Sequence, residues 1–289
     1  MMLMCSLQRV LRTIPALRVP KGKPKIPGEL KEHYEIEKEL AIRLRESSRE
    51  ERRSGLYASL YDEYYRRIQL SSETAQKSSL EKMLSHQLRF LRRFLDRDTV
   101  FLEIGAGDCA LSLAVARFVK KVYAVEVTNE ITKNLTYPQN FELILFEGYS
   151  IPLPADSLNV AYSNQVMEHL HPDDALEQLE NIRRILTNQG IYICITPNRL
   201  SGPHDISKYF ARVASGFHLK EYTCTELSNL FKQAEFSEVR VYIGAAGIYI
   251  RSPLFLLRFL ESLLHRLPYR LSKAIARRSL LNIRLVGTK

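Results

Sequence analysis

The pattern of apolar and polar residues changes character near Thr99. Residues 29–70 are strong helix formers with dense mixed charge, interrupted by Ser-Gly at 54–55. Residues 72–95 place leucines at helical spacing. One helical stripe of the first stretch holds four tyrosines, Tyr57, Tyr61, Tyr64 and Tyr65. The pattern predicts a helical cap over residues 29–97, in which these tyrosines pack rather than touch a substrate.

After residue 98, short apolar runs alternate with amphipathic stretches, which is typical of βα units on a mostly parallel sheet. The expected strands are 99–104, 121–126, 141–146, 158–163, 190–195, 236–243 and 282–287. The expected helices are 109–119, 129–136, 173–187 and one from Thr223 or Thr225 to Ala234. Residues 98–289 should therefore form one α/β domain, with a helical, apolar and basic insertion at 252–280 between the last two strands.

Charge is concentrated at the two ends of the chain. The net charge is +10, and residues 1–25 hold six Lys/Arg and no acid. Residues 251–289 hold nine Lys/Arg against Glu261 alone, which leaves the rest of the chain at −4. Such ends favour an anionic membrane surface or a polyanionic substrate over a nucleic-acid groove, with dispersed solubilising charge as an equal alternative. The Pro- and Lys-rich end of the N-terminal segment 1–28 predicts an extended linker.

The cysteines and the apolar runs bear on metal sites, disulfides and cellular location. The four cysteines lie far apart without a CxxC pair, so no zinc site or disulfide framework is expected, and no other metal site is predicted. No apolar run reaches the about 18 to 20 residues that span a bilayer, and no secretory signal is expected. A cytoplasmic protein, with peripheral membrane contact as a further expectation, fits these features. They predict no oligomeric state.

The stretch FLEIGAGDCALSLAVA carries the first chemical motif. An apolar strand from Phe101 turns through Gly105-Ala106-Gly107 into a helix, so a cofactor can approach the backbone and the exposed N–H groups. Glu126 ends the next strand, about 20 residues after the glycines. An acid at this position conventionally accepts hydrogen bonds from the ribose hydroxyls of a bound cofactor. The two features predict one nucleoside site. By themselves they also fit an NAD(P) site.

Glu103, two residues before the first glycine, favours S-adenosylmethionine over NAD(P). A carboxylate at this position can anchor the glycine turn or reach the cofactor's methionine ammonium, which a dinucleotide lacks. The alternative role is structural, as a cap for the N–H groups of the turn.

The block from Phe146 to Ala175, with FLEIGAGD and AVEV, resembles class I S-adenosylmethionine-dependent methyltransferases over residues 99–195. The resemblance implies a Rossmann-like fold whose last strand is antiparallel, as the ending FSEVRVYIG and NIRLVGTK also suggests. Glu147 and Leu158-Asn159 depart from the family's more usual Asp and Phe-Asp. Glu147, Gly148 and Tyr149 would then meet the adenine, and Asn164 and Gln165 would lie close to the sulfonium. The full expected cofactor set is Glu103, Gly105, Ala106, Gly107, Asp108, Glu126, Val127, Glu147, Gly148, Tyr149, Asn164 and Gln165.

The acceptor should lie at the loops after residues 163 and 195, beyond the carboxyl ends of the strands. These loops and the later GFHLKEYT hold the candidate residues Glu168, His169, His171, Asn198, Arg199, His204, Asp205, His218, Glu221 and Tyr222. We expect His204, helped by Asp205, to be a better general base than His169. His218 should position the following helix. Catalysis by alignment alone is the alternative.

TPNR, SGPHDIS and HLKEYT resemble bacterial methyltransferases that act on small molecules or glycans. The sequence thus predicts a methyltransferase that O-methylates a small molecule, a sugar or a lipid-linked acceptor. One alternative is an NAD(P)-dependent oxidoreductase, although no Tyr-x-x-x-Lys follows the fourth strand. Another is a non-catalytic protein of the same fold at a membrane surface, because 253–280 places Leu256, Phe259, Leu260, Leu263 and Leu267 on one face beside arginines. Packing on the cap or a dimer contact is the alternative explanation of that face.

Overall fold

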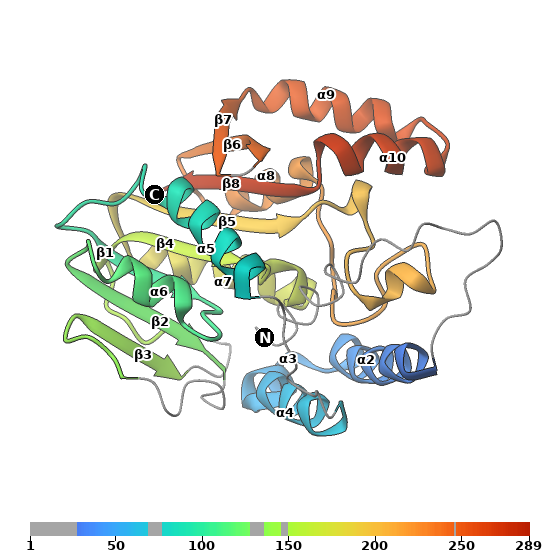
Figure 1. Ribbon diagram of the computed structural model, residues 1–289, viewed down its shortest axis with the longest axis horizontal. Coiled ribbons are helices and arrows are strands. Elements are labelled where there is room, and N and C mark those ends of the chain that lie inside the picture. The colour runs from blue at the N-terminus through green and yellow to red at the C-terminus, as the bar shows by residue number, and fades with distance from the viewer. Residues whose placement is uncertain (1–27, 69–76, 128–135, 146–149, 246) are drawn as a thin grey trace.

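The computed structural model describes residues 28–68, 77–127, 136–145, 150–245 and 247–289, and a single β-sheet forms its centre (Figure 1). Within these ranges the sheet has eight strands in the order β3-β2-β1-β4-β5-β8-β6-β7. They are β1 (Val100–Ile104), β2 (Lys121–Glu126), β3 (Phe141–Leu145), β4 (Leu158–Asn164), β5 (Leu186–Pro197), β6 (Glu238–Ala245), β7 (Ile248–Ser252) and β8 (Asn282–Thr288). The first five pair in parallel, and β8 runs antiparallel to β5 and β6. The expected Rossmann-like sheet with a reversed last strand is confirmed.

The sheet has one strand more than the seven expected. β7 pairs antiparallel with β6 at the edge of the sheet. Its Ile248 and Ile250 are 65% and 64% exposed, so its two isoleucines face solvent, and only Tyr249 between them packs against a core. A strand of this kind lacks the usual alternation of a half-buried strand, and the sequence therefore did not distinguish it from a loop.

Helices cover both faces of the sheet. The helices are α2 (Gly28–Glu46), α3 (Arg49–Glu51), α4 (Tyr57–Arg67), α5 (Lys77–Leu91), α6 (Ala110–Val115), α7 (Pro172–Ile185), α8 (Cys224–Gln233), α9 (Leu254–His265) and α10 (Tyr269–Ser279). Phe101 and Leu102 are neighbours in β1 and enter opposite cores, as the pleat requires. Phe101 packs with α5 and α6, and Leu102 packs with α7, α8 and α9.

The cap is smaller than predicted. α2 and α4 form a separate apolar cluster with Phe217, which includes Tyr57, Tyr61 and Tyr64. The chain bends between them at the expected point, because Gly55 adopts a φ of 93°. α5 lies instead on the sheet, where Phe90 and Leu91 join the core of β1 and β2. The helix expected at 129–136 falls almost entirely outside the described residues.

The insertion at 252–280 forms α9 and α10, which Figure 1 shows on the far side of the sheet from the cap. Glu261 of α9 is buried and accepts hydrogen bonds from the backbone N–H groups of Cys224 (2.6 Å) and Thr225 (2.9 Å), at the start of α8. The contact fixes α9 on the domain because Glu261 binds N–H groups at the start of α8 that have no acceptor within that helix. Among the described residues, no helix is both long and apolar enough to cross a membrane.

Candidate active site

The glycine turn between β1 and α6 lies against the end of β2. Gly105 and Gly107 have φ values of 71° and 59°, a left-handed backbone that favours glycine. Glu126 is 3% exposed and accepts hydrogen bonds from the N–H groups of Gly107 (2.7 Å) and Val127 (2.9 Å). The two features that the sequence assigned to one nucleoside site are therefore in direct contact.

Glu103 lies behind this turn. Its carboxylate accepts a 2.6 Å hydrogen bond from Ser112 Oγ in α6. Burial raises the pKa of this carboxyl to about 8, against the opposing effect of the Ser112 bond. Glu103 thus anchors α6, whereas the N–H groups of the turn and the helix start bind Glu126 and, at Ala110, the Asp108 carboxylate (3.0 Å).

A cavity beside the glycine turn extends to the cap. Its lining comprises Tyr57, Tyr61, Ile104, Gly105, Val125, Glu126, Val127, Val166, His169, Leu170 and Gln178. Three of these residues belong to the expected cofactor set, and His169 was expected on the acceptor side. Tyr57 and Tyr61 pack in the cap, as predicted, but they also line the cavity. The tyrosine stripe indicated burial correctly, and only the fold shows that two of its members face this cavity.

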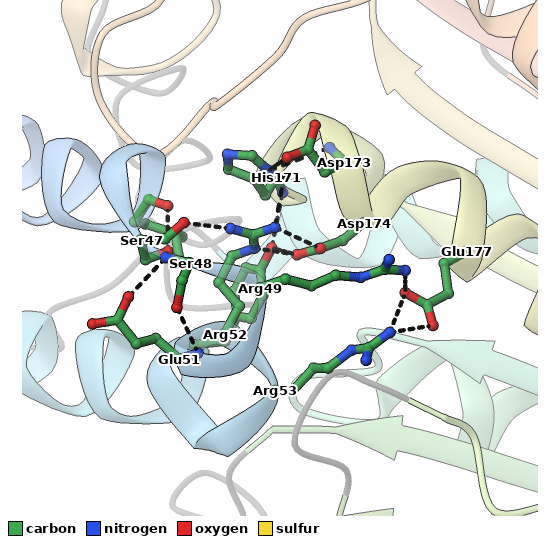
Figure 2. A network of polar contacts seen from close by, with 12 residues as sticks. Ser47, Ser48, Arg49, Glu51, Arg52, Arg53, His171, Asp173, Asp174 and Glu177 are labelled. Atoms are coloured by element: carbon green, nitrogen blue, oxygen red, sulfur yellow. Dashed lines mark hydrogen bonds and ion pairs between the residues drawn. The ribbon is translucent and has the colours of Figure 1, made fainter.

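Polar contacts hold the cap on α7 next to the cavity (Figure 2). The buried Arg52 donates from Nε to Asp174 Oδ2 (2.7 Å) and from Nη2 to Asp174 Oδ1 (2.9 Å). Tyr57 donates its hydroxyl to Asp174 (2.9 Å) and accepts from the N–H group of His171 (2.8 Å). Burial opposes ionisation of Asp174, but the Arg52 and Tyr57 bonds outweigh burial and lower its pKa. The bidentate pair therefore fixes Tyr57 at the cavity wall.

His169 reaches the cavity from the short turn η2 (Met167–His169) after β4. The ring is 3% exposed, and its Nδ1 lies 3.0 Å from the carbonyl oxygen of Phe217. Burial and the neighbouring His218 lower the pKa of His169 well below its usual value, so the ring is neutral. Because a carbonyl only accepts, Nδ1 carries the hydrogen and Nε2 keeps its lone pair.

His204 and Asp205 occupy a different position from the one predicted. The Nε2 atom of His204 lies 2.8 Å from Ser201 Oγ and 3.1 Å from the carbonyl oxygen of Asn198. The Asp205 carboxylate accepts from the N–H groups of Ser207 (3.1 Å) and Gly216 (2.9 Å). Neither residue is among those that line the cavity. Asp205 joins two parts of its own loop instead of serving as the orienting partner expected for His204.

His218 forms a buried pair with Glu221, 2.7 Å from Nδ1 to Oε1. Burial lowers its pKa, but Glu221, Asp205 and Glu168 outweigh burial and raise the pKa to about 9. Glu221 also accepts from the N–H group of His204 (2.6 Å), so it connects the two loops. His218 was expected to position the following helix, whereas its ring lies against His169, with ring centroids 4.9 Å apart.

The remaining expected cofactor residues lie at the end of β4 or outside the described residues. Asn164 ends β4, and Gln165 follows with a left-handed φ of 62°. The Oε1 atom of Gln165 is buried and has no hydrogen-bond partner among the described residues. Glu147, Gly148 and Tyr149 fall outside the described residues, so their contact with adenine stays a prediction.

Comparisons with known proteins concern the domain and the fold. Residues 102–194 match the methyltransferase domain family. No curated protein matches the chain. The solved structure of a Burkholderia thailandensis 1,6-didemethyltoxoflavin-N1-methyltransferase, with bound 1,6-didemethyltoxoflavin and S-adenosylhomocysteine, has a TM-score of 0.54 at 16% identity, covering 84% of this chain and 91% of that one.

Two further structures are similar in fold. An Archaeoglobus fulgidus S-adenosylmethionine-dependent methyltransferase has a TM-score of 0.50 at 15% identity, covering 81% of this chain and 100% of its own. A Thermotoga maritima S-adenosylmethionine-dependent methyltransferase has a TM-score of 0.50 at 16% identity, covering 81% and 98%. At these identities the likeness concerns the fold. Residues 102–194 thus match a methyltransferase domain, and the sheet has the fold of S-adenosylmethionine-dependent methyltransferases.

Proposed function

We propose that this protein transfers the methyl group of S-adenosylmethionine to an oxygen of a small-molecule, sugar or lipid-linked acceptor. One observation carries the proposal. A single cavity has the glycine turn and Glu126 on one side, and the cap tyrosines and His169 on the other. A cofactor on the first side would present its methyl group to an acceptor enclosed by the second.

The residues on the cofactor side fit this cofactor. Each carboxylate oxygen of Glu126 accepts one N–H group, and each has a second lone pair for a ribose hydroxyl. The buried, unpartnered Oε1 of Gln165 is an acceptor suited to a cationic group. A bound ammonium near Glu103 would favour its ionised form and so lower the raised pKa of that carboxyl.

On the acceptor side, we propose His169 instead of His204 as the general base. When bound, S-adenosylmethionine supplies a methyl group on a positively charged sulfur. Nε2 of His169 would accept the proton that the acceptor hydroxyl loses as its oxygen bonds to the methyl carbon. Support comes from the neutral ring of His169 and from its place in the cavity wall. The low pKa makes this base weak, so alignment supplies most of the acceleration.

Calorimetry tests the cofactor assignment. S-adenosylmethionine and S-adenosylhomocysteine should bind, and NADH should not. Glu126→Ala should weaken binding by about 1.5 to 3 kcal/mol, through lost charge-assisted hydrogen bonds. Glu142→Ala removes an exposed acid from the neighbouring β3 and is the matched control. Preferential binding of NADH, or equal affinity in both variants, would contradict the proposal.

The acceptor is found by incubating cell extract with protein and methyl-labelled cofactor and identifying labelled products by mass spectrometry. Methyl ethers among the products support the oxygen acceptor. Labelled methylamines or thioethers would leave the methyltransferase assignment standing and would contradict O-methylation.

A second proposal is that α9 and α10 contact anionic membranes. The side chains of Phe255 and Phe259 are 68% and 70% exposed. Leu256, Leu263 and Leu271 are exposed as well, next to Arg266 and Arg270. Exposed apolar side chains beside basic residues suit the boundary between lipid headgroups and acyl chains.

A further inference from the structure

A set of metal-ligand side chains lies beside the cavity, although the sequence predicted no metal site. One carboxylate oxygen of Glu168 and one ring nitrogen each of His169 and His218 lie within 4.8 Å of one another. All three residues are at most 3% exposed. Two ligands about 2.1 Å from an ion lie about 3.4 Å apart at the tetrahedral angle, so side-chain rotations would have to bring these atoms closer by up to about 1.4 Å for coordination.

The surroundings orient both imidazoles as metal ligands are oriented. Nδ1 of His169 donates to the carbonyl oxygen of Phe217 (3.0 Å), and Nδ1 of His218 pairs with Glu221 Oε1 (2.7 Å). Histidines that bind metals usually donate their other ring N–H to a carbonyl or a carboxylate in this way. Nε2 is then the atom of each ring that would coordinate the ion, and the ion would displace the proton that the raised pKa of His218 keeps on that ring.

Glu168 provides independent support for a ligand. Its Oε2 accepts from Thr196 Oγ1 (2.9 Å), but its Oε1 is buried and finds no hydrogen-bond partner in the part of the chain that the structure describes. Gln165, three residues earlier, has a buried carboxamide oxygen in the same condition. A buried acceptor without a partner costs about 1 to 3 kcal/mol, and a cation would remove that cost.

We infer that Glu168, His169 and His218 bind one divalent cation of the Zn²⁺, Mn²⁺ or Fe²⁺ class. Two imidazole nitrogens and one carboxylate suit these ions better than Mg²⁺ or Ca²⁺, which prefer all-oxygen sites. The nearby carboxylates of Glu221 and Asp205 add negative charge that favours a cation at this position.

Because His169 also lines the cavity, the ion would lie at its acceptor end. If the proposed function holds, a bound ion would occupy Nε2 of His169, so the ion would replace that nitrogen in activating the acceptor, by coordinating its oxygen and lowering the pKa of the hydroxyl. Metal binding itself does not depend on that function.

The test is titration of the full chain, stripped with EDTA, with Co²⁺ and Zn²⁺, followed by visible absorption and calorimetry. Wild type should bind one equivalent. Glu168→Gln and His169→Ala should lose at least tenfold in affinity, and Glu221→Gln should lose about 10- to 100-fold as the partner of a ligand. His265→Ala, which removes an exposed histidine, should bind like wild type.

No binding by wild type at one equivalent, or equal binding in all folded variants, would overturn the inference, as would binding of Mg²⁺ or Ca²⁺ alone. Circular dichroism identifies variants that fail to fold. Even if every variant fails to fold, the wild-type titration shows whether the chain binds one cation. S-adenosylmethionine affinity is measured on the same samples. If the wild type binds the cofactor but no cation, only the metal site is overturned. If it binds a cation but no cofactor, the proposed function is overturned.

Discussion

Two regions of the molecule depart from an apolar interior and a polar exterior, in opposite directions. Beneath the cap, Glu168, His169 and His218 are charged or polar and almost fully buried. On α9, Phe255 and Phe259 are apolar and more than two-thirds exposed. Burial of polar groups costs free energy unless partners compensate, and exposed apolar patches favour association. The difference shows that one fold buries polar side chains beside its cavity and exposes apolar side chains on a separate helix.

α9 itself shows why exposure must be assigned residue by residue. Leu257 and Leu264 are buried in the main core, whereas Leu256 and Leu263 are 50% and 48% exposed. Leu260, which the sequence placed with the exposed set, packs partly against that core. One face of the helix therefore packs on the main core and not, as one alternative expected, on the cap, and the membrane proposal concerns the other face.

The largest effect should come from the buried region. His169→Ala should slow methyl transfer by about 10²-fold, at the low end for a general base because this base is weak, and because a wall of the cavity is lost as well. His204→Ala, outside the lining, should retain most of the rate. Single-turnover transfer of labelled methyl groups to the identified acceptor measures both. A steep loss in His204→Ala with little change in His169→Ala would return the role of base to His204.

A second effect concerns pH and the buried Glu103. Its pKa is about 8 in the folded chain against 4.5 in the ordinary group, so the folded state holds the proton more tightly. This contribution should therefore make the protein less stable as pH rises from about 4.5 to 8, by up to a few kcal/mol. Glu103→Gln should remove this slope, and Glu142→Gln should not. Urea unfolding at several pH values measures the pH dependence of the free energy of unfolding. The same dependence in both variants would contradict the assignment of this dependence to Glu103.

A third effect separates the two faces of α9. Glu261→Ala should lower the free energy of unfolding by about 2 to 3 kcal/mol, because buried N–H groups at the start of α8 lose their acceptor. Phe259→Ala on the exposed face should change it by no more than about 0.5 kcal/mol. Urea denaturation decides, and similar losses in both variants would mean that the two faces are equally packed.

The smallest effect should be on membrane association. Wild type should float with phosphatidylserine vesicles at low salt and be released as salt rises. The double variant Phe255→Asp and Phe259→Asp should weaken binding at least about tenfold through lost apolar burial. Ile248→Asp, an equally exposed apolar position on β7, is the control. Concentration-dependent dimerisation without flotation would assign the apolar face to a second copy of the chain.

The sequence by itself determined the elements and the cofactor side. Periodicity and turn chemistry are local, so the strands, the glycine turn and the break near Gly55 agree with the structure. Glu126 was found because its spacing from the glycines reflects one βαβ unit. The sequence did not predict β7, because its exposed isoleucines do not give the alternation that indicates a half-buried strand.

The tertiary structure alone decided the acceptor side. Phe217 and His218 are distant from His169 in sequence, and only the fold brings them together. Packing likewise placed His169 in the cavity wall, used Asp205 within its own loop and turned Tyr57 toward the cavity. Local sequence restricts backbone dihedral angles, whereas the neighbours of a buried side chain depend on how separate elements pack.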